Sequence, residues 1–411
     1  MQRFFVHELS SGIKLLFNED QASVVTHCGV MIKTGTRDEP EGKEGLAHFI
    51  EHTLFKGTGK RKAFHILNHL EIVGGELNAY TTKEETCLHA TVMNMHLERA
   101  TELLADIALN ANFPDKELQK EKEVIIDEIH AYEDMPYEQI YDDFEALVFK
   151  NHPLGHPILG TIDSVSSFSR QDTLNYFHDN YKSGEIIFAV SSNAPYEKVF
   201  RVAEKYFSPK NKFLNGERKK FTSVAPQHLT AIKKINQVHY ITGCPAYPLS
   251  HRNRFTLLLL NNILGGPGMN SRLSLNIREK YGYTYSIESG YHAYSDAGLF
   301  NIYFATELKN FEKVKKLLEK EITRMLNPQM SERQFAQYKK QFIGQITIAQ
   351  ENRLNLLLSM AKSLLYFKKI FTLQEITAHI EKITLKEFMQ VAQTILSNQK
   401  YSSLTYMPAK E

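Results

Sequence analysis

Residues 45–57 read Gly-Leu-Ala-His-Phe-Ile-Glu-His-Thr-Leu-Phe-Lys-Gly, and this pattern predicts a short buried helix. At about 100° per residue, His48 and His52 lie within about 40° of each other on that helix, and Glu51 lies about 60° to the other side. The remaining faces are apolar, so the three polar groups would be buried together and would need a partner. A Zn²⁺ ion is such a partner, because neutral imidazole is a common zinc ligand and a glutamate beside it can act as a general base.

The composition is that of a soluble globular protein. The chain has 411 residues, of which 42% are hydrophobic and 23% charged, with a formal net charge of +2. The length predicts two or three domains, and the small net charge gives no reason to expect nucleic acid or an anionic membrane as a partner. Three widely spaced cysteines, Cys28, Cys87 and Cys244, form neither a disulfide framework nor a Cys-x-x-Cys zinc site. Neither a signal peptide nor a bilayer-spanning run is evident, so we expect a cytoplasmic protein.

Hydrophobic periodicity predicts strands and helices that are grouped rather than alternating one for one. In the first half the predicted strands are residues 4–9, 13–17, 24–33, 77–93 (one or two strands) and 185–190. The predicted helices there, besides the motif helix, are 63–72, 96–111, 115–132, 137–149, 171–181 and 195–207. The second half is predicted to have a strand region at 230–242, strands at 283–291 and 299–306, helices at 252–264 and up to 280, and then helices from 309 onward. Such grouping favours an α+β fold with antiparallel sheets and helices on one face.

The two halves look like copies of one α+β unit. Shifting the first half by 209 positions lays residues 48–57 over residues 257–266, helix over helix and Gly over Gly. On that register the residues that meet His48, Glu51 and His52 are Leu257, Leu260 and Asn261. We therefore predict a metal-bearing domain at 1–207, a linker at 208–227 and a degenerate domain at 228–411. The basic run 218–220 is interpreted as part of a solvated linker.

A catalytic zinc needs three protein ligands and one open position, so a third ligand must come from elsewhere. The helix predicted from residue 115 carries the candidates. Glu121 and Glu128 are seven positions apart and share a partly apolar face, which favours either of them over Glu123 or His130. Spacing alone leaves the choice between Glu121 and Glu128 open.

Taken together, these segments resemble the M16 metallopeptidases, the inverzincin group that includes pitrilysin, insulin-degrading enzyme and the mitochondrial processing peptidase. The resemblance covers nearly the whole chain and is closest to the short bacterial members of the processing-peptidase type. The segments that carry it are Gly-Thr-Arg-Asp-Glu-Pro-Glu-Gly (35–42), His-Phe-Ile-Glu-His (48–52), Asn-Ala-Tyr-Thr (78–81), residues 121–128 and residues 278–285. The separation of His52 and Glu128, 128 − 52 = 76 positions, is close to the family's interval.

The resemblance implies a role for each residue of the metal site. It implies that His48, His52 and Glu128 bind one zinc ion per chain and that Glu51 is the general base. Glu121 takes the position of the family's second carboxylate, which supports the site without binding the metal. A zinc ion that only holds the fold together would need a fourth ligand, and none is evident in the sequence.

The resemblance also implies residues that contact substrate. Arg278 and Tyr285 match a second-half pair that helps to hold substrate or the developing oxyanion. Asn78, Ala79 and Tyr80 match an edge strand to which the substrate backbone is added by main-chain hydrogen bonds. The glycine-rich run 265–268 lacks the Gly-Lys-Ser/Thr of a phosphate loop, so it is either a plain turn or, as in the family, a substrate-facing loop.

The implied fold is the LuxS/MPP-like metallohydrolase fold, with two duplicated domains of which only the first keeps the zinc motif. The implied function is a zinc endopeptidase that hydrolyses short or unfolded peptides inside a chamber closed by two chains. Because this chain carries both the zinc motif and the Arg/Tyr pair, we expect a homodimer, with pairing to an inactive paralogue as the alternative. The rival function is a non-catalytic core or assembly subunit, although such relatives generally lose part of the zinc set.

Overall fold

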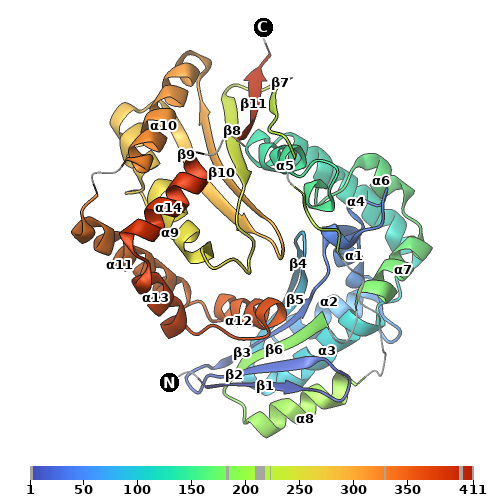
Figure 1. The fold of residues 1–411 in the computed structure, drawn as a ribbon. Helices are drawn as coiled ribbons and strands as arrows, with labels where there is room; N and C mark the ends of the chain where they lie inside the picture. The colour runs from blue at the N-terminus through green and yellow to red at the C-terminus, as the bar shows by residue number, and fades with distance from the viewer. Residues whose placement is uncertain are drawn as a thin grey trace. The chain divides into compact units, whose positions relative to one another are not determined.

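The computed structural model describes residues 3–181, 185–208, 218–222, 224–327, 330–397 and 401–409. The chain divides into two compact units, each made of three segments (Figure 1). Unit 1 comprises Met1–His130, His156–Arg218 and Ala349–Phe371, and unit 2 comprises Ala131–Gly155, Lys219–Ile348 and Thr372–Glu411. Among the described residues, no helix combines the length and the apolar character that crossing a membrane requires.

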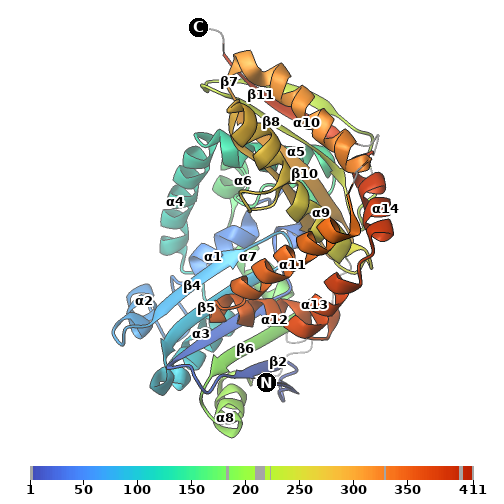
Figure 2. The ribbon, with the colours of Figure 1, turned by 90° about the vertical axis from the view of Figure 1, so that its left-hand side faces the viewer.

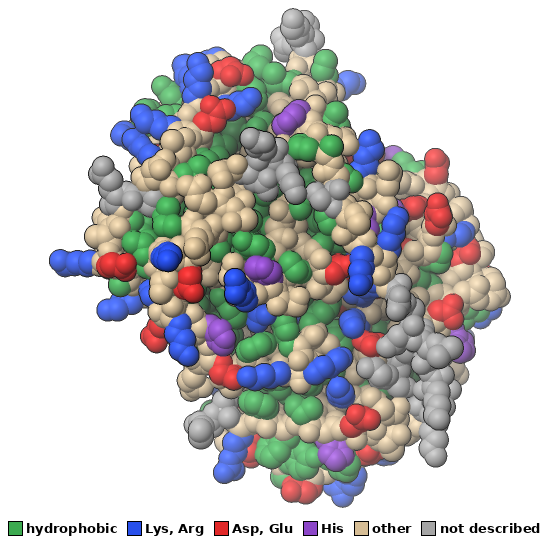
Figure 3. Space-filling model, viewed as in Figure 1, with side chains coloured by type: hydrophobic (Ala, Val, Ile, Leu, Met, Phe, Trp, Pro, Cys, Tyr) green, Lys and Arg blue, Asp and Glu red, His purple; other side chains and the backbone are tan. Residues whose placement is uncertain are grey.

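Lysine, arginine and acidic side chains are interspersed over the face drawn in Figure 3, in keeping with the small net charge.

Unit 1 is built on a six-stranded sheet with the order β1-β2-β6-β3-β5-β4. The strands are β1 (Arg3–Glu8), β2 (Lys14–Glu19), β3 (Val25–Ile32), β4 (Glu76–Thr81), β5 (Thr86–Met93) and β6 (Ile186–Ser192). β1 and β2 form the predicted hairpin, and the pairing of β2 with β6 is the one parallel pairing in the sheet. β6 is buried along its whole length, as expected for a central strand rich in β-branched and aromatic residues.

Both faces of this sheet are covered by helices. One face packs against the first-half helices, which are α1 (Leu46–Leu54), α2 (Ala63–Glu71), α3 (Leu97–Asn110), α4 (Asp115–Glu133), α6 (Ile162–Ser167), α7 (Arg170–Asn180) and α8 (Tyr196–Tyr206). The opposite face, with Leu16, Met31 and Ile187, packs against α12 (Arg353–Phe367), and Figure 1 shows the sheet between α8 and α12. Burying each such side chain contributes about 1.5–3 kcal/mol. The sequence predicted helices on only one face of the sheet, and the helix that covers the other face, α12, was not expected there.

Unit 2 repeats this topology. Its five-stranded sheet has the order β7-β11-β8-β10-β9. The strands are β7 (His228–Lys233), β8 (Val238–Pro245), β9 (Thr284–Ala293), β10 (Gly298–Thr306) and β11 (Ser402–Pro408). The parallel pair β7–β11 corresponds to β2–β6, and the antiparallel pairs that follow correspond strand by strand. β11 was not predicted, because helices were expected from residue 309 onward. β11 is an inner strand of the sheet, and its short polar sequence lacks the apolar run of its counterpart β6.

Helices cover both faces of the second sheet as well. One face packs against a cluster that includes α9 and α14, and the opposite face packs against α5 (Pro136–Val148), as Figure 1 shows. The second-half helices are α9 (Arg254–Gly265), α10 (Phe311–Leu326), α11 (Glu332–Ala349), α13 (Leu373–Lys382) and α14 (Leu385–Leu396), and residues Ser274–Glu279 form a π-helical turn. The offset of 209 places α1 at 46 + 209 = 255 to 54 + 209 = 263, inside α9. The predicted duplication of an α+β unit is therefore confirmed.

The units do not follow one cut in the sequence. α5 belongs to unit 2 although it precedes residue 150, and α12 belongs to unit 1 although it follows residue 350. The expected domain boundaries at 207 and 228 place α5 in the first domain and α12 in the second, so they predict neither assignment. Of the expected linker, residues 209–217 and 223 lie outside the described residues. Arg218 corrects the picture of a solvated basic run, because its guanidinium is 16% exposed and lies 2.7 Å from Asp38 Oδ2.

Candidate metal centre

α1 begins at a glycine that no other residue could replace without strain. Gly45 has φ 91°, and a Cβ at this position would lie 2.6 Å from the carbonyl oxygen of Leu159. Gly45 also has no side chain to cap the helix. The carboxylate of Glu39 does so instead, since it accepts hydrogen bonds from the backbone N–H groups of Gly45 (3.1 Å) and Ala47 (2.8 Å). The loop before α1 thereby holds the start of the helix.

The imidazoles of His48 and His52 stand next to each other on one side of α1. Their ring centroids are 4.6 Å apart, with an interplanar angle of 66°. His48 is 8% exposed, and Phe49 and Leu54 on the other sides of the helix are fully buried. Burial and the neighbouring His52 lower the pKa of His48 to about 3, so its imidazole is neutral at ordinary pH and has a lone pair available for a metal.

α4 brings Glu128 to these histidines as it runs past α1 (Figure 2). Glu128 Oε2 lies 3.6 Å from His52 Nε2 and 3.9 Å from His48 Nε2. These three ligand atoms lie within 4.8 Å of one another, and no other group of three such ligands occurs among the described residues. Zinc bond lengths of 2.0–2.2 Å imply ligand separations of about 3.3–3.6 Å in a tetrahedron. The separation of 3.6 Å lies at the upper end of this range and that of 3.9 Å is slightly longer, so the two imidazoles and the carboxylate are close enough to hold a zinc ion.

Glu121 approaches His52 from the side away from this group. Its Oε1 lies 3.2 Å from His52 Nδ1, and its Oε2 lies 2.6 Å from Lys56 Nζ. Burial opposes the ionised carboxylate, but the hydrogen bonds from His52 and Lys56 hold the pKa of Glu121 below its usual range. The neighbouring carboxylates, Glu121 first among them, raise the pKa of His52 against the effect of burial. When His52 is neutral, an ionised Glu121 accepts its Nδ1 proton, and the lone pair then lies on Nε2, facing Glu128. The sequence left Glu121 and Glu128 as alternatives, and the fold gives them different neighbours.

Glu51 lies on the same helix but outside the group of three ligand atoms. Its carboxyl group is partly buried, and this burial raises its pKa, while Thr81 of β4 and the charge of a protonated His52 act in the opposite direction. A carboxylate whose pKa is raised is a better proton acceptor than an ordinary glutamate.

The other predicted site residues lie on two further elements. Asn78, Ala79 and Tyr80 belong to β4, which is the edge strand of its sheet and contacts α1. Arg278 and Tyr285 belong to unit 2, where the guanidinium lies over the phenol ring at 5.4 Å and Tyr285 is 81% exposed. The structure therefore pairs Arg278 with Tyr285. Gly265 is the last residue of α9, and a Cβ there would lie 2.5 Å from the backbone nitrogen of Ser289. Close packing against β9 therefore explains why this position is a glycine.

Two residues that contact this region were not predicted from the sequence: Lys56, which pairs with Glu121, and Glu39, which caps α1. Lys56 is four positions after His52, a spacing that places the two on one side of a continuing helix, so a signal was present. Glu39 caps α1 from a loop, and only the chain path could reveal it.

The chain is similar to known proteins along nearly its whole length. Residues 14–162 match the family model described as Insulinase (Peptidase family M16), and residues 167–342 match the model described as Peptidase M16 inactive domain. A Rickettsia felis protein named as an uncharacterized zinc protease is 32% identical over 98% of this chain and 97% of its own length. The uncharacterized zinc protease YmxG of Bacillus subtilis is 30% identical over 94% of each chain.

Solved structures show the same fold. The crystal structure of a protease from Helicobacter pylori superposes with a TM-score of 0.91 at 18% identity, covering 99% of this chain and all of the other. A structure described as a peptidase M16 inactive domain from Pseudomonas fluorescens gives a TM-score of 0.91 at 17% identity.

Proposed function

This chain belongs to peptidase family M16, and on that premise we propose that it is a zinc-dependent endopeptidase that hydrolyses short or unfolded peptides. The observation that carries the proposal is the convergence of His48 Nε2, His52 Nε2 and Glu128 Oε2 beside a carboxyl group, that of Glu51, which is not one of the three. The proposal includes one zinc ion per chain, which is supported by the one group of three such ligands among the described residues.

Zinc, when bound, supplies Lewis-acid chemistry that polarises a carbonyl group and makes a nearby water more acidic. In our proposal Glu51 is the general base: it takes the proton of the attacking water and passes it to the leaving amine. The raised pKa of Glu51, caused by burial, suits both steps. Glu121 orients His52 through the Nδ1 hydrogen bond of 3.2 Å and does not bind the metal.

We further propose that the substrate backbone is added to β4 at Asn78, Ala79 and Tyr80. One support is the position of β4 at the edge of the sheet, beside α1. Another is that the backbone N–H of Ala79 donates to the side-chain oxygen Oδ1 of the preceding residue, Asn78, at 2.8 Å. A substrate carbonyl could replace that side-chain acceptor. Arg278 and Tyr285 are proposed to stabilise the oxyanion, a contribution typically worth about 3–4 kcal/mol when one donor is removed.

We propose a cytoplasmic homodimer in which two chains close the chamber around the peptide. The presence of both the zinc ligands and the Arg/Tyr pair in one chain supports identical partners over an inactive paralogue. Sedimentation of the purified protein tests this, and a stable 1:1 complex with a paralogue in the source cell would contradict it.

The test of the function is Glu51→Gln, assayed on a mixed peptide library by mass spectrometry. Zinc content should remain at one ion per chain while cleavage falls by at least about 100-fold, the usual contribution of a general base. Glu71→Gln, at an exposed position of α2, is the matched control and should cleave normally. Undiminished cleavage by Glu51→Gln would refute the role of Glu51. A zinc-loaded wild type that cleaves no peptide would favour the assembly-subunit alternative.

A further inference from the structure

The carboxylate of Glu121 is shared between two partners that both lie at the end of α1. Its Oε1 accepts the proton of His52 Nδ1 at 3.2 Å, and its Oε2 lies 2.6 Å from Lys56 Nζ. The Glu121 side chain is only 8% exposed, so each oxygen has one protein partner in a poorly hydrated place. Ammonium–carboxylate contacts of this length are charge-assisted hydrogen bonds and stronger than neutral ones.

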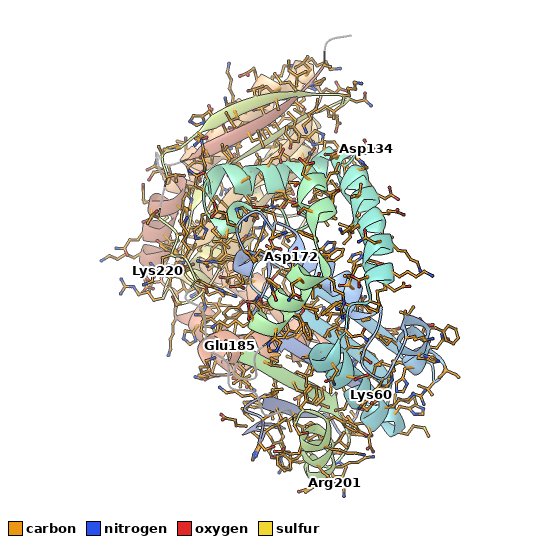
Figure 4. All side chains as sticks on the ribbon, turned by 90° about the vertical axis from the view of Figure 1, so that its right-hand side faces the viewer. Lys60, Asp134, Asp172, Glu185, Arg201 and Lys220 are labelled. Atoms are coloured by element: carbon orange, nitrogen blue, oxygen red, sulfur yellow. The ribbon has the colours of Figure 1, made fainter. Side chains whose placement is uncertain are left out.

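Lys56 differs from the other lysines of its neighbourhood. A pocket of about 610 Å³ is lined by Lys56, Lys60, Lys62 and Lys116 among other residues. Of these four, within the described part of the chain, only Lys56 forms an ion pair with a carboxylate. Lys60 follows in the loop between α1 and α2, where Figure 4 shows it at the surface. The ammonium of Lys56 is therefore directed to the buried carboxylate, although solvent is within reach of its 27% exposed side chain.

We propose that Lys56 is a positioning residue of the metal centre, which holds Glu121 in the orientation that makes His52 present Nε2 to the metal. The inference rests on the proposed zinc site and extends it by one side chain. Lys56 reaches one carboxylate oxygen, and this leaves the other oxygen aimed at His52 Nδ1. The proton on Nδ1 then fixes the tautomer and ring orientation of His52, and Nε2 keeps its lone pair toward Glu128. Lys56 contacts neither metal nor substrate, so it acts only through Glu121.

The experiment measures the dissociation constant of zinc by competition with a chelator, using full-length protein and no peptide. Lys56→Met should weaken zinc binding about tenfold, the low end of the 10–100-fold range for residues that support metal ligands. Lys56→Arg keeps a charged donor and should restore affinity to within about threefold of wild type. Lys60→Met removes a charge from the same pocket without touching Glu121 and should bind zinc as wild type does. Lys56→Gln serves in the same role should Lys56→Met fail to fold, as judged by circular dichroism.

A double-mutant cycle separates this role from a merely structural one. If Lys56 acts through Glu121, Lys56→Met should cause no further loss of zinc affinity in a Glu121→Gln background. Unchanged affinity in Lys56→Met, or a tenfold loss that persists in the Glu121→Gln background, would overturn the inference. Wild-type protein that binds no zinc would overturn it together with the proposed function, whereas absent peptide cleavage by a zinc-binding protein would leave the inference standing and remove only the peptidase activity.

Discussion

Glu39 Oε1 accepts a hydrogen bond from the backbone N–H of Ala47 at 2.8 Å, and this contact joins the loop at residues 34–45 to the helix that carries the histidines. The first N–H groups of a helix have no partner within the helix, and at α1 a carboxylate from outside satisfies two of them. A buried donor left without its acceptor costs about 1–3 kcal/mol. The stability of α1, which carries His48 and His52, should therefore depend on Glu39, although Glu39 is not one of the proposed metal ligands.

We expect Glu39→Ala to lower the free energy of unfolding by about 2 kcal/mol, measured in urea on the metal-free protein. Glu41→Ala, an exposed position of the same loop, is the control and should stay within about 0.5 kcal/mol of wild type. If both variants unfold at the wild-type urea concentration, the cap contributes nothing to stability.

A buried ion pair fixes the same loop to the strand region. Arg37 Nη1 lies 2.7 Å from Glu84 Oε1, with side chains 1% and 5% exposed. Arg218 Nη1 lies 3.2 Å from the same Glu84 oxygen, so removal of Arg37 leaves Glu84 with a cationic partner and should cost less than the about 3–5 kcal/mol of an uncompensated buried charge. We expect Arg37→Met to lower the free energy of unfolding in urea by about 1–3 kcal/mol, and Glu84→Met, which removes the acceptor of both guanidinium groups, to lower it by more. A smaller loss in Glu84→Met than in Arg37→Met would contradict the account.

The stability of α7 should depend on pH through Asp172, which Figure 4 labels. Burial alone would raise its pKa, but hydrogen bonds from Ser169 and the ammonium of Lys43 at 3.0 Å hold the pKa of Asp172 below its usual range. Because the pKa is lower in the folded than in the unfolded protein, the stabilisation is present in full above about pH 4 and is lost as the pH falls through the folded value.

Asp172→Asn should therefore be less stable than wild type at pH 7, and the difference should shrink as the pH falls below about 4. Urea unfolding at several pH values measures this. Asp179→Asn, exposed on the same helix, is the control and should be about as stable as wild type at pH 7. A difference for Asp172→Asn that stays constant down to pH 3 would rule out the assigned cause.

Two tyrosines of α5 donate to one carboxylate oxygen of β9. Tyr141 Oη lies 2.5 Å and Tyr137 Oη 3.0 Å from Glu288 Oε1, and Tyr137 is the more exposed at 40%. Burial and the contact with Glu288 raise the pKa of Tyr141, so the phenol stays a donor at any ordinary pH. We expect Tyr141→Phe to lower the free energy of unfolding by about 1–2 kcal/mol and Tyr137→Phe by less. A larger loss in Tyr137→Phe than in Tyr141→Phe, measured by urea unfolding, would show that burial does not determine how much each hydrogen bond contributes to stability.

Zinc should raise the melting temperature of metal-depleted protein, because a ligand that binds only the folded state stabilises it by about 2.7 kcal/mol at 100 times its dissociation constant. Glu128→Gln and His52→Ala should lose most of this shift. Glu51→Gln should keep the full rise in melting temperature, because a general base does not bind the metal. Glu123→Gln, at an exposed position of α4, is the control and should also keep it. A full shift in Glu128→Gln would exclude Glu128 as a ligand.

Much of the fold could be predicted from periodicity, because most elements carry strong local patterns. The hairpin β1–β2, the helix at residues 45–57 and the long helix α4 all stand out in the sequence, and the duplication followed from one offset. β11 and α6 were missed because one has a short polar sequence and the other only six residues. The exchange of α5 and α12 was missed for another reason. Which sheet an amphipathic helix packs on is set by contacts between residues far apart in the chain, which local patterns do not record.

For the site, the sequence by itself determined that His48, His52 and Glu51 share one side of a helix, because that depends only on helical periodicity. It also restricted the third ligand to two carboxylates on one face of α4. Only the tertiary structure decided between their surroundings, since the packing of α4 on α1 puts Glu128 at 3.6 Å from His52 Nε2 and Glu121 at 3.2 Å from His52 Nδ1. The two nitrogens of one imidazole lie on opposite sides of the ring, so the choice between metal ligand and supporting carboxylate depends on the direction from which each side chain approaches.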